Sequence, residues 1–234
     1  MSEWVLVVGG TRGTGLLIAR LLVERGYQVR VLARDVARAA TELGSAVEVI
    51  GGDMTQPYTL FPAVEGVDHV IVTAGLRSGR FARESQVKAT DYQGVLNVLE
   101  TGREAGLRGR FMYMNSIGIR TPSWAATVLN LVKGNTLEWR RRVESAIRAS
   151  EVDYTIIRTG FLLNAAGGKR AVVVGQGALP LLWRYRIARA DVAEAFVEAL
   201  RHPRASRATF EIAWAEGPRR EPWAAMYNRL RTDG

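Results

Sequence analysis

The stretch that decides the fold is residues 4–32, which read WVLVVGGTRGTGLLIARLLVERGYQVRVL. The apolar run at 4–8 has the length of a buried strand, and a glycine-rich turn follows it at 9–15. Residues 16–25 predict a helix, and residues 28–32 predict a second strand. A strand, a glycine turn, a helix and a second strand form the βαβ unit that is typical of dinucleotide binding.

The three spaced glycines of this turn have separate physical roles. Gly9 allows the tight turn after the strand, and Gly15 lets the helix pack closely against the sheet. Gly13 has no Cβ, so its backbone can approach a pyrophosphate. The start of the helix also offers N–H groups and a partial positive charge to phosphates. We therefore predict a nucleotide site here; the alternative is an ordinary glycine-rich turn without a ligand.

The residue at the end of the second strand indicates which nucleotide is preferred. An NAD site usually has an acidic residue there, which binds the ribose 2′-OH. Arg34 occupies this position and could hold a 2′-phosphate through two charge-assisted hydrogen bonds, and Arg12 could reach the same phosphate. Asp35 is better placed as the N-cap of a helix over Val36–Leu43. We predict NADP(H) as the cofactor; the alternative is that Arg34 is one surface arginine among 29.

Length and composition limit the class of protein. A chain of 234 residues with 47% apolar side chains can form one domain with a sizeable core. It has no cysteine, which excludes disulfides and thiol chemistry, and its two histidines, His69 and His202, form no metal-binding pattern. We expect no metal, no signal peptide and no membrane span. The absence of cysteine fits a cytoplasmic protein, which is the expected location.

The net charge of +9 comes from arginines that are spread along the chain. Their densest cluster, at 140–142, lies in a helical stretch between glutamates, which is typical of a solvated helix face. The charge therefore favours an anionic cofactor or substrate over nucleic acid. We expect a small-molecule substrate, no nucleic-acid partner, and a monomer or a homodimer.

Strands and helices continue to alternate along the chain. Further strands are predicted at 47–50, 68–72, 110–114 and 154–158, and further helices at 56–64, 85–105 and 127–149. Short, continuously apolar strands are typical of a sheet with helices on both faces. Right-handed crossovers then predict an α/β fold, a Rossmann-like doubly wound parallel sheet with a small C-terminal substrate lobe. We expect a single domain over 1–234, with lobe segments at about 120–135 and 161–188.

Ligands of such a sheet bind at the carboxyl ends of its strands. That edge receives the glycine turn and the segments that follow the other strands. Each of these segments could also be plain turn chemistry, such as an Asx-turn at Asp53, but their shared location favours a common role. The predicted cofactor-binding residues are Gly9, Thr11, Arg12, Gly13, Thr14, Gly15, Arg34, Asp53, Met54, Thr73, Ala74, Gly75 and Thr159.

The chain resembles the short-chain dehydrogenase/reductase superfamily, and within it the atypical, NmrA-like NAD(P)H-binding branch. The resemblance covers nearly the whole chain and is carried by Gly9–Gly15, 33–35, Gly52-Asp53, 90–98, Asn115-Ser116, 153–160 and 187–193. It implies adenine contacts from Asp53 and Met54 and a backbone wall at 73–75. It also implies that the stretch after the sixth predicted strand lies near the nicotinamide, where this chain has Thr159 in place of a frequent proline.

One departure from the superfamily concerns its chemistry. The usual acid is a tyrosine four residues before a lysine, which holds the ribose and lowers the tyrosine pKa. In the best alignment this pair becomes Thr136 and Arg140. None of the three lysines has a tyrosine four residues before it; those positions hold Glu84, Leu129 and Ala165. The resemblance therefore implies cofactor binding without the usual proton donor.

The missing acid favours one class of acceptor. Reduction of an isolated ketone needs a proton donor, whereas a flavin, a quinone or another conjugated acceptor delocalises the charge and needs mainly orientation. We predict an NADPH-dependent reductase of a small conjugated acceptor, like the flavin and biliverdin reductases of the resembled branch. Ser116 is the predicted substrate-binding residue, although it could instead cap the strand-end turn. Tyr92, Tyr185 and Lys133 stay open as further contacts.

Two other functions remain possible from the sequence. A non-catalytic NADP(H)-binding redox sensor would tolerate loss of the tyrosine–lysine pair, and a redox-neutral isomerase or epimerase would use bound cofactor without net turnover. Specificity should come from the least regular segments, at 76–83, 120–135 and 161–185. Their aromatic residues suit either a binding pocket or a lobe core: Phe81, Trp124, Phe161, Trp183 and Tyr185.

Two features near the C-terminus complete the expectations. Three arginines could add affinity for an acidic substrate: Arg184, Arg186 and Arg189. The segment 222–231 predicts a short amphipathic helix that packs on the body or on a partner through Trp223, Met226 and Leu230.

Overall fold

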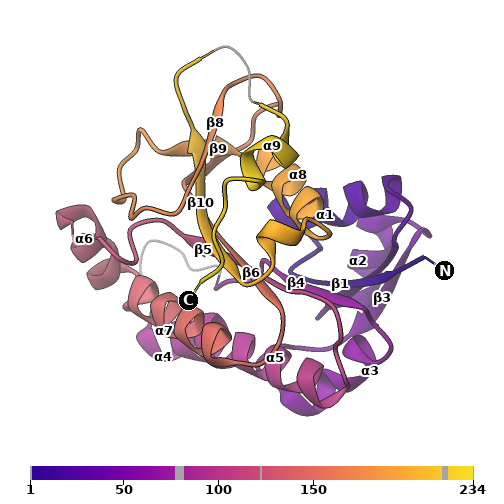
Figure 1. Ribbon diagram of the computed structural model, residues 1–234. Coiled ribbons are helices and arrows are strands. Elements are labelled where there is room, and N and C mark those ends of the chain that lie inside the picture. The colour runs from indigo at the N-terminus through magenta and orange to yellow at the C-terminus, as the bar shows by residue number, and fades with distance from the viewer. Residues whose placement is uncertain (1, 77–81, 122, 218–220, 234) are drawn as a thin grey trace.

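A computed structural model describes residues 2–76, 82–121, 123–217 and 221–233. Its centre is an eight-stranded sheet with the order β3-β2-β1-β4-β5-β6-β10-β8 (Figure 1). Neighbours are parallel except at the β10–β8 edge. The strands are β1 (Trp4–Val8), β2 (Gln28–Ala33), β3 (Val47–Gly51), β4 (His69–Val72), β5 (Phe111–Ser116), β6 (Tyr154–Thr159), β8 (Val172–Gly175) and β10 (Ala208–Trp214). The predicted Rossmann-like fold class is confirmed.

Helices cover both faces of the sheet. They are α1 (Gly13–Glu24), α2 (Val36–Leu43), α3 (Phe61–Val64), α4 (Glu84–Val87), α5 (Val95–Glu104), α6 (Trp124–Val132), α7 (Thr136–Ala149), α8 (Arg189–Ala199) and α9 (Trp223–Tyr227), with the short turns η1 (Pro57–Thr59) and η3 (Pro203–Ala205). Val5 and Val7 of β1 pack with α1 and α8, whereas Leu6 and Val8 pack with α3, α5 and α7. Because side chains alternate along a strand, the apolar run of β1 serves two separate cores.

The two long predicted helices differ from regular α-helices in different ways. The predicted helix at 85–105 becomes α4, the π-helical segment η2 (Lys88–Gly94) and α5. The predicted helix at 127–149 becomes α6 and α7, because Gly134 and Asn135 take positive φ angles of 58° and 57°. A Cβ on Gly134 would lie 2.8 Å from the Cα of Glu84, so this break also lets α4 approach closely. The predicted helix at 85–105 is therefore confirmed as one helical stretch over 84–104, and the prediction of one continuous helix is wrong only at 127–149.

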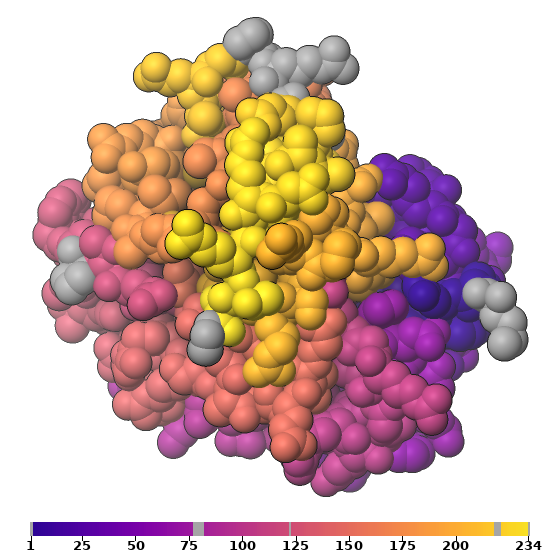
Figure 2. All heavy atoms as spheres, viewed as in Figure 1, coloured from indigo at the N-terminus to yellow at the C-terminus, as the bar shows by residue number. Residues whose placement is uncertain are grey.

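A second, two-stranded sheet builds the C-terminal lobe. β7 (Phe161–Leu163) pairs in parallel with β9 (Arg186–Ala188), so that the end of β6 and the start of α8 are held together. The C-terminal helix α9 packs on the body as expected: Trp223, Met226 and Leu230 are 4–5% exposed within the core beside α8. Figure 2 shows these last residues as a yellow layer on the surface of the body. Among the described residues, none of the helices has the length and apolar character that crossing a bilayer requires.

His69, at the start of β4, gives the fold a pH dependence. Its imidazole is buried, and its Nδ1 accepts the backbone N–H of Arg110 at 2.8 Å. Burial lowers the pKa of His69 below its ordinary value, and the Glu3 carboxylate, 3.5 Å from Nε2, opposes this shift. The folded state therefore favours the neutral imidazole, whereas the unfolded chain takes up a proton below about pH 6.5.

We expect the free energy of unfolding to fall as the pH drops below about 6.5, by at most about 1.4 kcal/mol per pH unit for this one group. Gln in place of His69 can still accept the Arg110 N–H but does not titrate. Urea unfolding at pH 7.5 and pH 5.5 should therefore show a smaller difference for His69→Gln than for the wild type. Equal differences would contradict the role of His69. His202, whose pKa is also lowered by burial and then by Arg110, contributes in the same direction.

Candidate functional site

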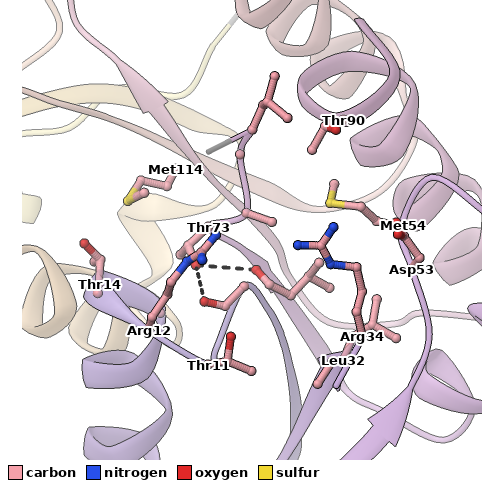
Figure 3. Close-up of a pocket in the computed structure, with 18 of the residues that line it drawn as sticks. Thr11, Arg12, Thr14, Leu32, Arg34, Asp53, Met54, Thr73, Thr90 and Met114 are labelled. Carbon is pink, nitrogen blue, oxygen red and sulfur yellow. Dashed lines mark hydrogen bonds between the residues drawn. The ribbon is translucent and has the colours of Figure 1, made fainter. Parts of the chain in front are cut away.

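A cavity of about 1040 Å³ opens at the carboxyl ends of β1, β2, β4 and β5 (Figure 3). All but one of the predicted cofactor-binding residues line it: Gly9, Thr11, Arg12, Gly13, Thr14, Gly15, Arg34, Asp53, Met54, Thr73, Ala74 and Gly75. They come from four separate stretches of the chain. The structure therefore brings these stretches together at the carboxyl ends of the strands, as the sequence predicts. That each of them binds a cofactor stays a prediction.

The glycine turn forms the floor of this cavity. Gly9 has a φ of +94°, and a Cβ there would lie 2.7 Å from the backbone nitrogen of Ala74. A Cβ on Gly15 would lie 2.2 Å from the carbonyl oxygen of Gly9. The Thr73 hydroxyl donates to the carbonyl oxygens of Val8 and Gly9 at 3.4 and 3.5 Å, as the dashed lines in Figure 3 mark. Only glycine fits at 9 and 15, because the loop packs directly on the end of β4.

The start of α1 presents one hydroxyl without a hydrogen-bond partner in the described residues to the cavity. Its N-cap residue, Arg12, makes no capping hydrogen bond with its side chain, and its first turn contains no acidic residue. The Oγ1 of Thr14 is buried and has no hydrogen-bond partner in the described part of the chain. Thr14 lines the cavity, so this hydroxyl is available to an anionic ligand at the positive end of the helix. These features fit the phosphates of a nucleotide.

The charge of the lining is positive. Among the described lining residues the basic ones are Arg12, Arg34 and Arg189, and the acidic one is Asp53. In the described residues, both hydrogen bonds of the Asp53 carboxylate lie within its own turn: Oδ1 accepts the backbone N–H and the hydroxyl of Thr55, each at 2.9 Å. Figure 3 shows the Arg12 and Arg34 side chains extending into the cavity, the latter beside Met54 and Asp53. The arrangement therefore favours a ligand with several negative charges.

Arg34 is exposed and forms no ion pair within the described ranges. The neighbouring Asp35 does not neutralise it, because Asp35 is the N-cap of α2 and its Oδ1 accepts the Arg38 N–H at 3.1 Å, as predicted. Met54 opposite is 6% exposed, and its carbonyl oxygen accepts the side-chain amide of Asn97 at 2.9 Å. The apolar side chain of Met54 and the guanidinium of Arg34, which has no ion pair in the described residues, therefore face the same part of the cavity.

Two predicted residues lie outside the cavity lining. The Thr159 hydroxyl is buried between β5 and β6, where it donates to the carbonyl oxygen of Asn115 at 3.3 Å. The Ser116 hydroxyl donates to the carbonyl oxygen of Ile117 at 3.0 Å, which is the strand-end capping role. Ser116 nevertheless faces the same side of β5 as Met114, which does line the cavity, because side chains alternate along a strand.

The positions of the superfamily's tyrosine and lysine serve a different purpose here. The Thr136 hydroxyl and the Arg140 Nη2 both lie 3.3 Å from Oδ2 of Asp91, and the Leu76 N–H donates to Oδ1 of the same carboxylate. Asp91 belongs to η2 and is 3% exposed. This buried cluster ties α7 and η2 to the cavity wall at Leu76. Sequence reasoning missed Asp91, whose only local signal is a carboxylate within a helical stretch.

None of the described tyrosines lines the cavity. Burial raises the pKa of Tyr113, beside Arg140, to about 12. The ring of Tyr92 packs on Trp139, with centroids 5.3 Å apart. The Tyr185 hydroxyl accepts from Arg184 at 3.2 Å. The cavity lining includes none of these tyrosines, nor Lys133.

The aromatic residues of the lobe do not form one pocket. Phe161 and Trp183 stack with centroids 5.1 Å apart, whereas Trp124 is 78% exposed on α6. Phe161 and Tyr185 pack against the small core cluster around Ile117 and Leu181. Phe81 lies outside the described residues. Lining residues without an individual role in the sequence analysis include Leu76, Gln86, Ala89, Thr90, Met114, Leu162 and Asn164, and Arg189, expected only as a contact for an acidic substrate, also lines the cavity.

Comparison with known proteins connects this site to a family. The model of a family described as NAD(P)H-binding matches residues 9–203. A curated relative, sanguinarine reductase from Eschscholzia californica, is 32% identical over 89% of this chain and 88% of its own length. An anaerobilin reductase from Escherichia coli O157:H7 is 24% identical, with a TM-score of 0.75 over 94% of this chain and 100% of its own. A short-chain dehydrogenase/reductase from Veillonella parvula, solved with NADP, is 17% identical, with a TM-score of 0.72 over 94% of this chain and 97% of its own.

Proposed function

This chain belongs to the NAD(P)H-binding family, and we propose that within it the chain is an NADPH-dependent reductase of a small conjugated acceptor. The observation that carries the proposal is the composition of the cavity. The cavity is lined by the glycine turn, by three arginines and by the Thr14 hydroxyl, which has no hydrogen-bond partner in the described residues. The carboxylate in the described lining, that of Asp53, accepts hydrogen bonds from its own turn. The match with sanguinarine reductase, a relative named as a reductase, favours net reduction over redox-neutral chemistry.

The preference for NADPH over NADH rests on Arg34 and Arg12. Arg34 stands where an NAD-specific site has a carboxylate for the ribose 2′-OH. A planar guanidinium matches a phosphate with two parallel hydrogen bonds, and a second guanidinium from the glycine turn adds to the attraction. Asp53 and Met54 would contact the adenine, and the wall at Thr73–Gly75 would direct the rest of the nucleotide toward Met114.

The class of acceptor follows from the absence of a proton donor in the described lining. When bound, the nicotinamide supplies a hydride. The residues of this chain then have to orient the acceptor rather than protonate it, because a conjugated acceptor delocalises the charge and takes its proton from solvent. Ser116, just beyond Met114 on the same face of β5, is our candidate for the hydrogen bond to this acceptor. The substrate is thus a small molecule, and a cytoplasmic location stays a prediction from the sequence.

The experiment that tests this function is NADPH consumption by the purified chain with flavins, quinones and conjugated carbonyls, with nucleotide binding followed by fluorescence in the same sample. Turnover with any acceptor would support the reductase. Clear binding without turnover across the panel would instead support the non-catalytic sensor, since the same absence of an acid permits that role. Failure to bind NADPH at all would reject both.

Ser116→Ala should lower turnover about tenfold, because one hydrogen bond to the acceptor is lost, while the affinity for NADPH stays unchanged. Steady-state kinetics and fluorescence titration of the same preparation measure the two effects. Ser145→Ala, on the exposed side of α7, is a matched control, because its hydroxyl contacts only the carbonyl of the preceding turn at 3.2 Å. Unchanged turnover in Ser116→Ala would remove this residue from the mechanism.

A further inference from the structure

We propose that Arg189 is a diphosphate-binding residue of the cavity, which holds the dinucleotide against the start of α1 and does so equally for NADPH and NADH. The inference rests on the function proposed above and adds a residue that the glycine turn does not predict. Arg189 is the first residue of α8, 176 positions after Gly13 along the chain. In the folded chain its Nε lies 3.6 Å from the place that a Cβ would occupy on Gly13.

The position of Arg189 is fixed before any ligand binds. α8 packs on α1 through a shared core that includes Val192, Phe196 and Ile18, all 0% exposed. The start of α8 is anchored by Asp191, whose carboxylate accepts the Gly168 N–H at 2.6 Å and the Trp214 indole N–H at 2.9 Å. A guanidinium held on a rigid element needs little ordering when it binds a phosphate.

The hydrogen bonds of Arg189 leave part of its guanidinium available. Nη1 donates to the carbonyl oxygen of Leu162 at 3.2 Å and to Oδ1 of Asn164 at 2.9 Å. Both of these residues also line the cavity. Arg189 forms no ion pair with the residues that the structure describes. A guanidinium has five N–H donors, so Nε and Nη2 can still donate to an anion, which would also supply the missing counter-charge.

The location of Arg189 predicts which part of the nucleotide it binds. It lies over Gly13, at the start of α1, where the diphosphate of a dinucleotide sits in this kind of fold. Arg34 lies at the end of β2, beside Asp53 and Met54 (Figure 3). Because NADPH and NADH share the diphosphate and differ at the 2′-phosphate, Arg189 should affect both nucleotides and Arg34 only one.

The test is fluorescence titration of NADPH and NADH with the wild type, Arg189→Met, Arg189→Lys and Arg25→Met. Arg25 is a matched control, because it joins α1 to α8 through Glu198 at 2.7 Å but at the end of α1 that is far from the glycine turn. We expect Arg189→Met to weaken both nucleotides about tenfold and equally, Arg189→Lys to restore part of the affinity, and Arg25→Met to change neither.

Two results would overturn the proposed role of Arg189 and leave the proposed function standing. The first is that both Arg189 variants bind the nucleotides with wild-type affinity. The second is that only NADPH binding is weakened, which would place Arg189 at the 2′-phosphate. If Arg189→Met does not fold, Arg189→Lys decides, because a shorter cation with fewer donors should still bind both nucleotides more weakly than arginine does. If the wild type binds neither nucleotide, the proposed function itself fails, and this result differs from every outcome that concerns Arg189.

Discussion

Arg34→Ala is expected to weaken NADPH binding about 100-fold and to change NADH binding by less than about threefold. A charge-assisted hydrogen bond contributes about 1.5–3 kcal/mol, and a guanidinium can make two to one phosphate. Arg34 has no ion pair to break within the described ranges, so its removal leaves no carboxylate without a partner. Arg12 remains to hold part of the phosphate, and this limits the loss.

Fluorescence titration with both nucleotides measures the ratio of their affinities directly. Arg38→Ala is the matched control: Arg38 is another exposed arginine, four residues further along on α2, and it does not line the cavity. The control should leave both affinities unchanged. An equal loss of NADPH and NADH affinity in Arg34→Ala would contradict the 2′-phosphate role, because Arg34 would then act on a part of the nucleotide that both share.

The half of the sheet that carries the cavity is more predictable from sequence than the other half. β1, β2 and β4 are apolar runs with helices on both faces, so their composition alone identifies them. β10 is equally buried, but its sequence, ATFEIAW, contains Glu211, and no strand is predicted there. Glu211 is tolerated because Arg158 of β6, 53 residues away in sequence, lies beside it and the Leu179 N–H donates to it at 3.0 Å.

The walls of the site depend on contacts that no local pattern shows. Arg189 is expected from the sequence only as a contact for an acidic substrate, whereas the structure places it over Gly13 because α8 packs on α1. The cluster of Asp91, Thr136 and Arg140 likewise joins η2 to α7. The positions of the glycines and of Arg34 at the cavity are predictable because they follow from backbone geometry and from the end of a strand, both of which the βαβ unit determines.

The second large effect concerns stability. Arg158→Met should lower the free energy of unfolding by about 3–5 kcal/mol at neutral pH. Arg158 is 2% exposed, between Glu144 of α7 and Glu211 of β10, which are 5% and 2% exposed. Its Nε donates to Glu144 at 3.0 Å and its Nη1 to Glu211 at 3.3 Å. Removal of the guanidinium leaves two buried carboxylates close together without their counter-charge. Losing one member of a buried ionic group therefore destabilises a protein more than replacing all of its members by uncharged side chains.

The pH dependence of this variant separates the electrostatic effect from simple loss of packing. Burial already raises the pKa of Glu211 in the wild type, although Arg158 and the Leu179 N–H oppose the shift. Because the pKa of Glu211 is higher in the folded than in the unfolded protein, the folded protein binds this proton more tightly. The free energy of unfolding therefore falls as the pH rises from the ordinary pKa of a glutamate through the raised pKa of the folded state. Arg158→Met removes the opposing charge, and its deficit should therefore be larger at pH 8 than at pH 5.

Urea unfolding at these two pH values measures the deficit, and two further variants isolate its cause. Arg141→Met removes an exposed arginine that pairs with Glu138 at 2.8 Å, and it should lower stability by less than about 1 kcal/mol. The triple variant Arg158→Met, Glu144→Gln, Glu211→Gln should recover much of the stability lost in Arg158→Met, because it removes all three charges of this buried group. The loss of stability could instead be independent of pH and persist in the triple variant. In that case neither carboxylate causes the loss, and Arg158 stabilises the fold through the packing of its side chain.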